Sequence, residues 1–120
     1  SIGLRMDKKI IKPWGSEELI EVNEHYVVKR LFMKKKHQCS LQYHEDKHET
    51  VFVISGELKL TIGDSIEKLD FVVLNPGDSV VLPPKKIHRM YGNEDTYYLE
   101  ASTTELHDVI RIEDDYNRVN

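Results

Sequence analysis

Four residues, Gln42, His44, Glu49 and His88, bring two nitrogen and two oxygen ligand types together from two separate parts of the chain. Gln42 and His44 stand two residues apart, and in a β-strand such residues project from the same face. Glu49 opens a β-branched run that ends at a glycine turn, and His88 follows a second, proline-rich turn. Imidazole and carboxylate ligands together suit zinc, iron, manganese or nickel. The sequence therefore predicts a divalent metal site on a β-barrel. Ligand chemistry alone does not choose among these metals, and zinc is the one expected.

The segment from His44 to His48 also spells His-Glu-x-x-His, the zinc-protease motif, which works only on a helix. The residues that follow, 50–54, are rich in β-branched types and predict a strand, so a helix has no room here. The protease reading is therefore rejected. Beside a metal, His48 has the side chain of a general base, because imidazole exchanges protons near neutral pH. A solvated surface residue is the alternative.

Short β-branched runs recur between glycine and proline turns, which is typical of an antiparallel barrel or sandwich. No linker divides the chain, so residues 1–120 are expected to form one domain with a core at about 26–102. The segment 103–108 is expected to carry one helical turn. The predicted strands are Tyr26–Met33, Cys39–Tyr43, Thr50–Ser55, Glu57–Ile62, Phe71–Leu74, Ser79–Leu82, His88–Tyr91 and Tyr97–Ser102.

Composition narrows the class of function. The formal net charge is −4 and the sequence pI is about 5.8, which argues against binding to nucleic acid or to an anionic membrane. The single cysteine, Cys39, cannot form an intramolecular disulfide, and no apolar stretch approaches the roughly 20 residues that span a bilayer. A cytoplasmic location is expected. No glycine-rich phosphate loop is present.

Two motifs carry a family resemblance. Gln42-x-His44-(x4)-Glu49-(x6)-Gly56, followed by Gly77-(x5)-Pro83-(x4)-His88, resembles the paired motifs of the cupin superfamily. Five further stretches are similar to the mannose-6-phosphate isomerase domain of bifunctional isomerase/guanylyltransferases: Lys12-Pro13-Trp14-Gly15, Val28-Lys29-Arg30, Ser40-Leu41-Gln42-Tyr43-His44, Val53-Ile54-Ser55-Gly56 and Val109-Ile110-Arg111-Ile112-Glu113-Asp114-Asp115-Tyr116. The resemblance implies an all-β, single double-stranded β-helix, or jelly roll, with short terminal arms, and a homodimer.

The resemblance also implies an activity, an aldose–ketose isomerase acting on a sugar phosphate or nucleotide sugar in polysaccharide precursor metabolism. Mannose 6-phosphate is the leading substrate. The metal would polarise a substrate oxygen, and His48 would carry the proton between carbons. Arg111 lies in the family's Val-x-Arg-x-x-Asp-x-Tyr run and is expected to act on the substrate, with Lys85 or Lys86 helping to neutralise its phosphate. A salt bridge from Arg111 to a neighbouring carboxylate is the alternative.

Two departures from the family pattern keep rival functions open. Lys47 stands where the family has arginine, and Lys85 stands where the second motif has glycine. The first departure favours a non-catalytic or regulatory sugar-binding cupin. A second rival is an Fe(II) oxygenase, because two histidines and a carboxylate can form a facial triad. Gln42 counts against the oxygenase, since it would occupy a position that oxygen chemistry needs open.

Overall fold

A computed structural model describes residues 8–118 as eleven strands in two antiparallel sheets, with no helix among them. The six-stranded sheet has the order β1 (Lys8–Lys12), β2 (Gly15–Val22), β3 (Val27–Met33), β10 (Thr96–Ser102), β5 (Glu49–Ser55) and β8 (Ser79–Leu82). The five-stranded sheet has the order β11 (Ile110–Glu113), β4 (Leu41–Tyr43), β9 (Ile87–Gly92), β6 (Leu58–Gly63) and β7 (Leu69–Leu74). The predicted all-β jelly roll is confirmed.

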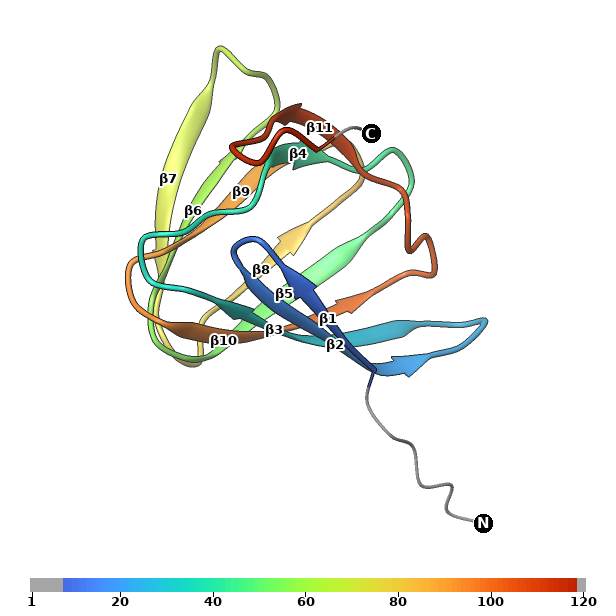
Figure 1. The fold of residues 1–120 in the computed structure, drawn as a ribbon. Coiled ribbons are helices and arrows are strands. Elements are labelled where there is room, and N and C mark those ends of the chain that lie inside the picture. Colours follow the sequence, from blue (N-terminus) through green and yellow to red (C-terminus); the bar gives the residue numbers. More distant parts are fainter. Residues whose placement is uncertain (1–7, 119–120) are drawn as a thin grey trace.

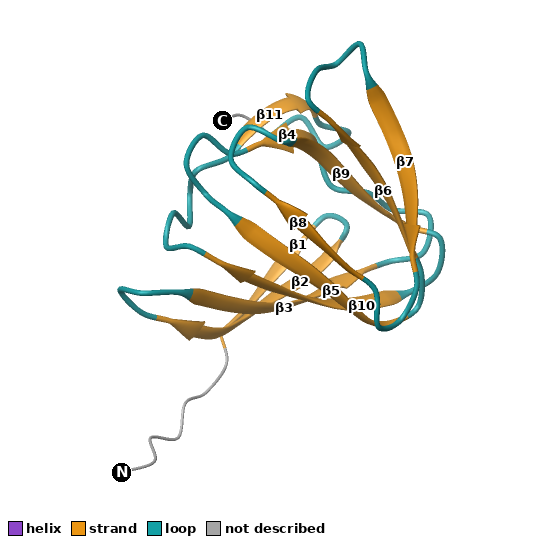
Figure 2. Ribbon diagram, turned by 180° about the vertical axis from the view of Figure 1, so that it is seen from behind, coloured by secondary structure: helices purple, strands orange, loops and turns teal. Residues whose placement is uncertain are grey.

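The two sheets face each other across one interior. Figure 1 shows β4, β9 and β11 above β3 and β10, with the hairpin β1–β2 in front of β5 and β8. The opposite view in Figure 2 brings β5 and β8 to the front and leaves the hairpin behind them. The six-stranded sheet therefore curls, so that its first two strands lie across the interior from its last two.

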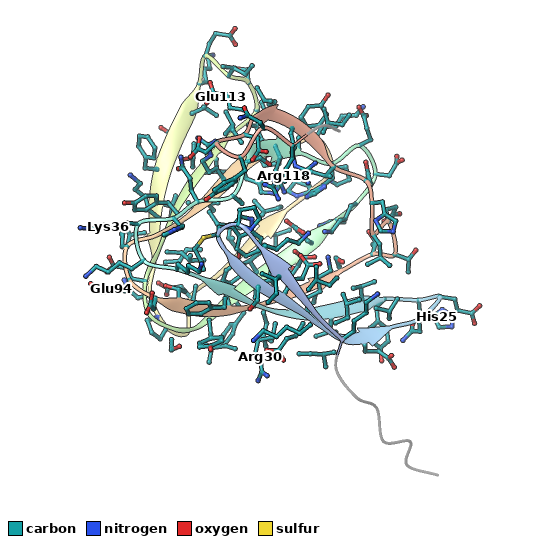
Figure 3. All side chains as sticks on the ribbon, in the orientation of Figure 1. His25, Arg30, Lys36, Glu94, Glu113 and Arg118 are labelled. Atoms are coloured by element: carbon teal, nitrogen blue, oxygen red, sulfur yellow. The ribbon has the colours of Figure 1, made fainter. Side chains whose placement is uncertain are left out.

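Strict alternation along the strands decides which side chains enter this interior. In β3, Val27, Leu31 and Met33 are buried, and Lys29 shares their face, whereas Arg30 is exposed and pairs with Glu18 on the outside. Strand alternation allows only one of these two adjacent basic residues to point inward, and Figure 3 shows Arg30 on the outer surface. The period of two thus carries a charged side chain into the barrel.

An apolar cluster fills the barrel below the charged residues. It draws on both sheets, which is what closes a jelly roll around one core. Its buried members are Trp14, Leu31, Met33, Cys39, Val51, Val53, Leu58, Leu60, Leu74, Leu82, Met90 and Tyr98.

All eight predicted strands are present, with boundaries within two residues of those expected. Three further strands, β1, β2 and β11, were not predicted. The helical turn expected at 103–108 is wrong, because this segment contains only turns and bends. The predicted domain also included residues 1–7 and 119–120, which lie outside the described residues. Within residues 8–118, no helix has the length and apolar character needed to cross a membrane.

Glycine is required at one tight corner, and the chain supplies a matched control. Gly56 and Gly77 both have positive φ angles, of 88° and 92°. A Cβ at Gly56 would lie 2.3 Å from the Asp95 carbonyl oxygen, whereas a Cβ at Gly77 would meet nothing within 4 Å.

We expect Gly77→Ala to lower the free energy of unfolding by about 1–2 kcal/mol, the cost of left-handed backbone in an L-residue. Gly56→Ala should cost roughly 3 kcal/mol or more, because backbone overlap adds to that strain. Parallel chemical denaturation of the two variants measures the difference. Equal losses would show that crowding at Gly56 is relieved without cost.

Candidate metal centre

Three side chains with metal-binding atoms converge inside the barrel. The ligand atoms of His44, Glu49 and His88 all lie within 4.8 Å of one another. His88 Nε2 is 3.4 Å and His44 Nε2 is 3.8 Å from the same oxygen, Glu49 Oε1. All three residues are buried, with exposed fractions between 2% and 6%. This spacing is that of a single ion with one ligand atom from each residue.

The strands position these groups from three directions. Gln42 in β4 pairs directly with His88 in β9, and His44 follows two residues after Gln42. Glu49 begins β5 and shares its inner face with Val51, which is completely buried. The turn after β8 leads straight into β9, which brings His88 beside Gln42 in the neighbouring strand. The predicted ligand set is thereby assembled, and residues 44–48 form no helix, as the rejection of the protease motif requires.

A backbone carbonyl orients each of the two imidazole rings. His44 Nδ1 donates to the carbonyl oxygen of Asp108, and His88 Nδ1 donates to that of Lys86 at 2.9 Å. A carbonyl can only accept, so each Nδ1 carries the proton and each Nε2 presents a lone pair to the cluster. Burial lowers the pKa of His88 to about 4 and also lowers the pKa of His44. Both rings are therefore neutral at pH 7 and ready to bind a cation.

A chain of buried charges adjoins the cluster. The Lys47 ammonium lies 3.1 Å from Glu49 and 2.9 Å from Glu100, and all three side chains are at most 10% exposed. Burial opposes a charged Lys47, but Glu100 and Glu49 outweigh it and raise the pKa of Lys47. Lys29 then continues the chain from Glu100 to Glu17, at 3.9 Å and 3.1 Å. The sequence marked Lys47 only as a departure from the family pattern, and it did not single out Glu100.

These residues fit a divalent cation. His44 Nε2 is buried without a hydrogen-bond partner among the described residues, although it faces Glu49 Oε1 in the cluster. Burial, together with Glu100, raises the pKa of Glu49. A cation among these ligands would favour the ionised carboxylate and use the imidazole lone pair. Gln42 lines the same cavity, and Ser40 Oγ donates to its Oε1 at 2.6 Å, which orients that oxygen as a candidate fourth ligand.

Asp108 holds the loop that carries the ligands. Its carboxylate accepts backbone N–H bonds from Glu45, Asp46 and Lys47 at 2.8–3.0 Å, in addition to the bond from His44 to its carbonyl. These bonds lower the pKa of Asp108. A residue 61–64 positions away in sequence thus fixes the segment 44–47, and no local pattern in the sequence pointed to it.

Three residues predicted to act on the substrate are not brought to the cluster. His48 is exposed and lies beside His25 and Tyr26 in a separate surface depression. Because Lys47 and Glu49 both point inward, alternation turns His48 outward, which corrects the expectation that it stands beside the metal ligands. Lys85 is exposed and Lys86 pairs with Asp64, so neither lysine lines the cavity described next.

Arg111, in contrast, does line the cavity that contains the cluster. This cavity has a volume of about 330 Å³. Half of its lining residues lie outside the predicted core of 26–102, because the hairpin β1–β2 and the segment around β11 form much of the wall. The lining residues are Lys8, Ile10, Lys12, Trp14, Glu17, Leu19, Lys29, Leu31, Cys39, Gln42, His44, Lys47, Glu49, His88, Met90, Tyr98, Glu100, Leu106, His107, Val109, Arg111 and Arg118.

Comparison with known families identifies the family of this chain. A family model described as mannose-6-phosphate isomerase C-terminal matches residues 3–119. The chain belongs to this family. The resemblance inferred from the sequence motifs is confirmed, and the match includes both the ligand cluster and the hairpin that covers it.

Curated relatives of this isomerase-family domain are longer proteins. The mannose-1-phosphate guanylyltransferase ManC of Salmonella typhimurium is 29% identical over 119 residues, and the xanthan biosynthesis protein XanB of Xanthomonas campestris pv. campestris is 28% identical over 116. The matches cover 95% and 92% of this chain but 24% of each relative. The chain therefore spans about a quarter of the length of the relatives it matches.

Solved structures confirm that the domain has the cupin fold. The capsular polysaccharide assembling protein CapF from Staphylococcus aureus superposes with a TM-score of 0.78 at 14% identity, over 90% of this chain and 34% of that one. Oxalate decarboxylase from Bacillus subtilis gives 0.77 at 16%, over 88% and 30%. At these identities the likeness establishes the fold alone.

We expect Asp108→Ala to weaken metal binding by roughly 10- to 100-fold while leaving the barrel folded. The substitution removes the acceptors that hold residues 45–47, but it keeps the carbonyl that orients His44. Competition with a chelator measures the affinity, and circular dichroism checks the fold. Asp46→Ala is the control, because it removes a carboxylate from the same loop, and the Asp46 side chain is exposed. Equal affinity in both variants would show that Asp108 does not position the ligands.

Proposed function

We propose that this cupin domain is a metal-dependent sugar-phosphate isomerase, with the interconversion of mannose 6-phosphate and fructose 6-phosphate as the leading reaction. One observation carries the proposal: the His44, Glu49 and His88 cluster opens into a cavity that also presents cationic side chains. A buried polar cluster in a concave, partly apolar cavity is the usual setting of a small-molecule site. Relatives named for mannose-1-phosphate and xanthan chemistry support a place in polysaccharide precursor synthesis.

His44, Glu49 and His88, with Gln42 as a fourth ligand, would hold a divalent metal. Such a metal acts as a Lewis acid, which polarises a sugar oxygen and acidifies the neighbouring C–H. Zinc is our first choice on ligand type. Manganese is the main alternative, since the oxalate decarboxylase of Bacillus subtilis, similar in fold, has Mn(II) centres.

The chain's own residues prepare the cavity for an anionic sugar. Arg111 faces the cavity from β11 and supplies a guanidinium group suited to phosphate oxygens. Trp14, Leu31 and Met90 are buried members of the same wall, and their apolar surfaces limit the water that reaches the cluster. Low water content strengthens every charge interaction in the cavity.

The ion pairs of Lys47 favour a second candidate, a sugar-binding cupin without turnover. Where the family has arginine, the Lys47 ammonium is committed to Glu49 and Glu100 and is only 6% exposed. A basic group held in this way is less available to a substrate. Metal and sugar binding would persist in such a protein, whereas chemistry at the sugar carbons would not.

Exchange of a carbon-bound proton separates the two candidates. The metal-loaded protein is incubated with mannose 6-phosphate in D2O, and we expect deuterium at C2 of the recovered sugar, because an enediolate can form only after that proton leaves. Nuclear magnetic resonance and mass spectrometry measure the label. Sugar binding without label, tested with several hexose phosphates and metals, would overturn the isomerase proposal in favour of the sugar-binding one.

The same assay tests the corrected position of His48. Because its side chain is exposed outside the cavity, His48→Gln should change the exchange rate by less than about twofold, far below the roughly 10²-fold loss expected on removing a general base. A loss of that larger size would return the role of base to His48. Oxygen consumption by the iron-loaded protein would instead favour the oxygenase. The homodimer and the cytoplasmic location remain predictions.

A further inference from the structure

The hairpin strand β1 presents two lysines to the cavity. Lys8, Ile10 and Lys12 alternate along the strand, and all three line the cavity wall. Lys9 and Ile11, between them, are exposed, and Ile11 retains 75% of its accessible surface. The strand therefore has a clear inner face, and both end positions of that face are basic.

Two further cations reach the cavity from the C-terminal segment. Arg111 lies in β11, and Arg118 follows the last turn, where its guanidinium binds Asp114 at 3.0 Å. Figure 3 shows Arg118 between β11 and the hairpin β1–β2. The two terminal segments of the described chain thus bring basic residues to one cavity from opposite sides.

The carboxylates of the cavity are already compensated. Glu17 pairs with Lys29, and Glu49 and Glu100 both pair with Lys47. Among residues 8–118, no ion pair includes Lys8 or Lys12, even though Lys12 is half-buried. Each of the three carboxylates in the inner part of the cavity is thus paired with Lys29 or Lys47. The two lysines of the β1 wall, in contrast, have no carboxylate partner among residues 8–118.

We infer that Lys12, together with Lys8 and Arg111, forms an anion subsite that holds the phosphate of the ligand. This inference rests on the proposed function only in naming a sugar phosphate as the ligand. A half-buried ammonium attracts an anion more strongly than a fully solvated one, because less water screens the charge. The subsite replaces the phosphate contacts that the sequence assigned to Lys85 and Lys86. It also gives the hairpin a role, since the strand that covers the cavity selects the charge of what enters.

Isothermal titration of the metal-loaded protein with inorganic phosphate, mannose 6-phosphate and mannose tests the subsite. We expect Lys12→Ala to weaken phosphate and mannose 6-phosphate by roughly tenfold or more and to leave mannose unchanged, since one charge-assisted contact is lost. Lys9→Ala is the matched control, a lysine of the same strand that points outward, and it should change neither affinity. Lys12→Arg should retain most of the binding, which guards against a purely structural effect of the alanine.

Failure of the subsite is distinguishable from failure of the isomerase. If Lys12→Ala and Lys9→Ala bind mannose 6-phosphate equally well, or if the unmodified protein has no preference for it over mannose, the subsite is overturned. Deuterium exchange at C2 would still support the isomerase proposal in that case. Conversely, phosphate binding that depends on Lys12 without any exchange would support the subsite and reject the isomerase.

Discussion

The carboxylate of Glu49 is 3% exposed, and the interior of this barrel is organised around it. An ionised group removed from water is tolerated only when cations and hydrogen-bond donors replace its hydration. Here the Lys47 ammonium lies 3.1 Å from Glu49 Oε2, whereas the two imidazole lone pairs, at 3.4 Å and 3.8 Å, face Oε1 and would require a cation between them. Lys47 also forms an ion pair with Glu100. Glu100 in turn pairs with Lys29, and Lys29 pairs with Glu17 in β2. One buried charge thereby connects the ligand cluster to the wall formed by the N-terminal hairpin.

The jelly roll makes this arrangement possible because alternation sends every second side chain of each strand into the same interior. Apolar residues fill one part of that space, and the charged residues occupy the part beneath β1–β2 and β11. The hairpin and the C-terminal segment therefore form part of the cavity wall rather than peripheral arms. Arg111 and Lys12 enter the cavity from these two elements, and Asp108 fixes the ligand loop from the segment just before β11.

The strands of the barrel core could be predicted from the sequence, because they are β-branched runs between glycine and proline turns. The missed strands lack that pattern. β2 has consecutive glutamates, Glu17 and Glu18, and β1 reads Lys-Lys-Ile-Ile-Lys, so neither shows an alternation of apolar and polar residue types. β2 pairs with β3, and β1 pairs with β2. The candidate metal ligands, which the structure brings together, were predicted from spacing within strands and from family motifs.

The charged partners of the ligands were harder to predict. Glu100 shares a face with Tyr98 by simple alternation, so the strand pattern indicated that Glu100 points inward. Buried carboxylates are uncommon, however, and the sequence alone did not predict that Glu100 is buried. Lys47 and His48 lie in a run of charged residues that is typical of a solvated loop. Glu49 points into the barrel, so alternation turns His48 outward and Lys47 inward. The direction of Glu49 therefore has to be known before the burial of Lys47 and the exposure of His48 can be predicted. Lys85 and Lys86 are close to His88 in sequence, but the turn that carries them lies outside the cavity.

X-ray absorption at the K-edge of the bound metal tests the central claim that Glu49 and its neighbours form a metal centre. The account predicts scattering from two imidazole rings together with oxygen ligands at about 2.0–2.2 Å, and loss of one imidazole contribution in His88→Ala. A first shell of oxygen alone, or a spectrum unchanged by His88→Ala, would contradict it.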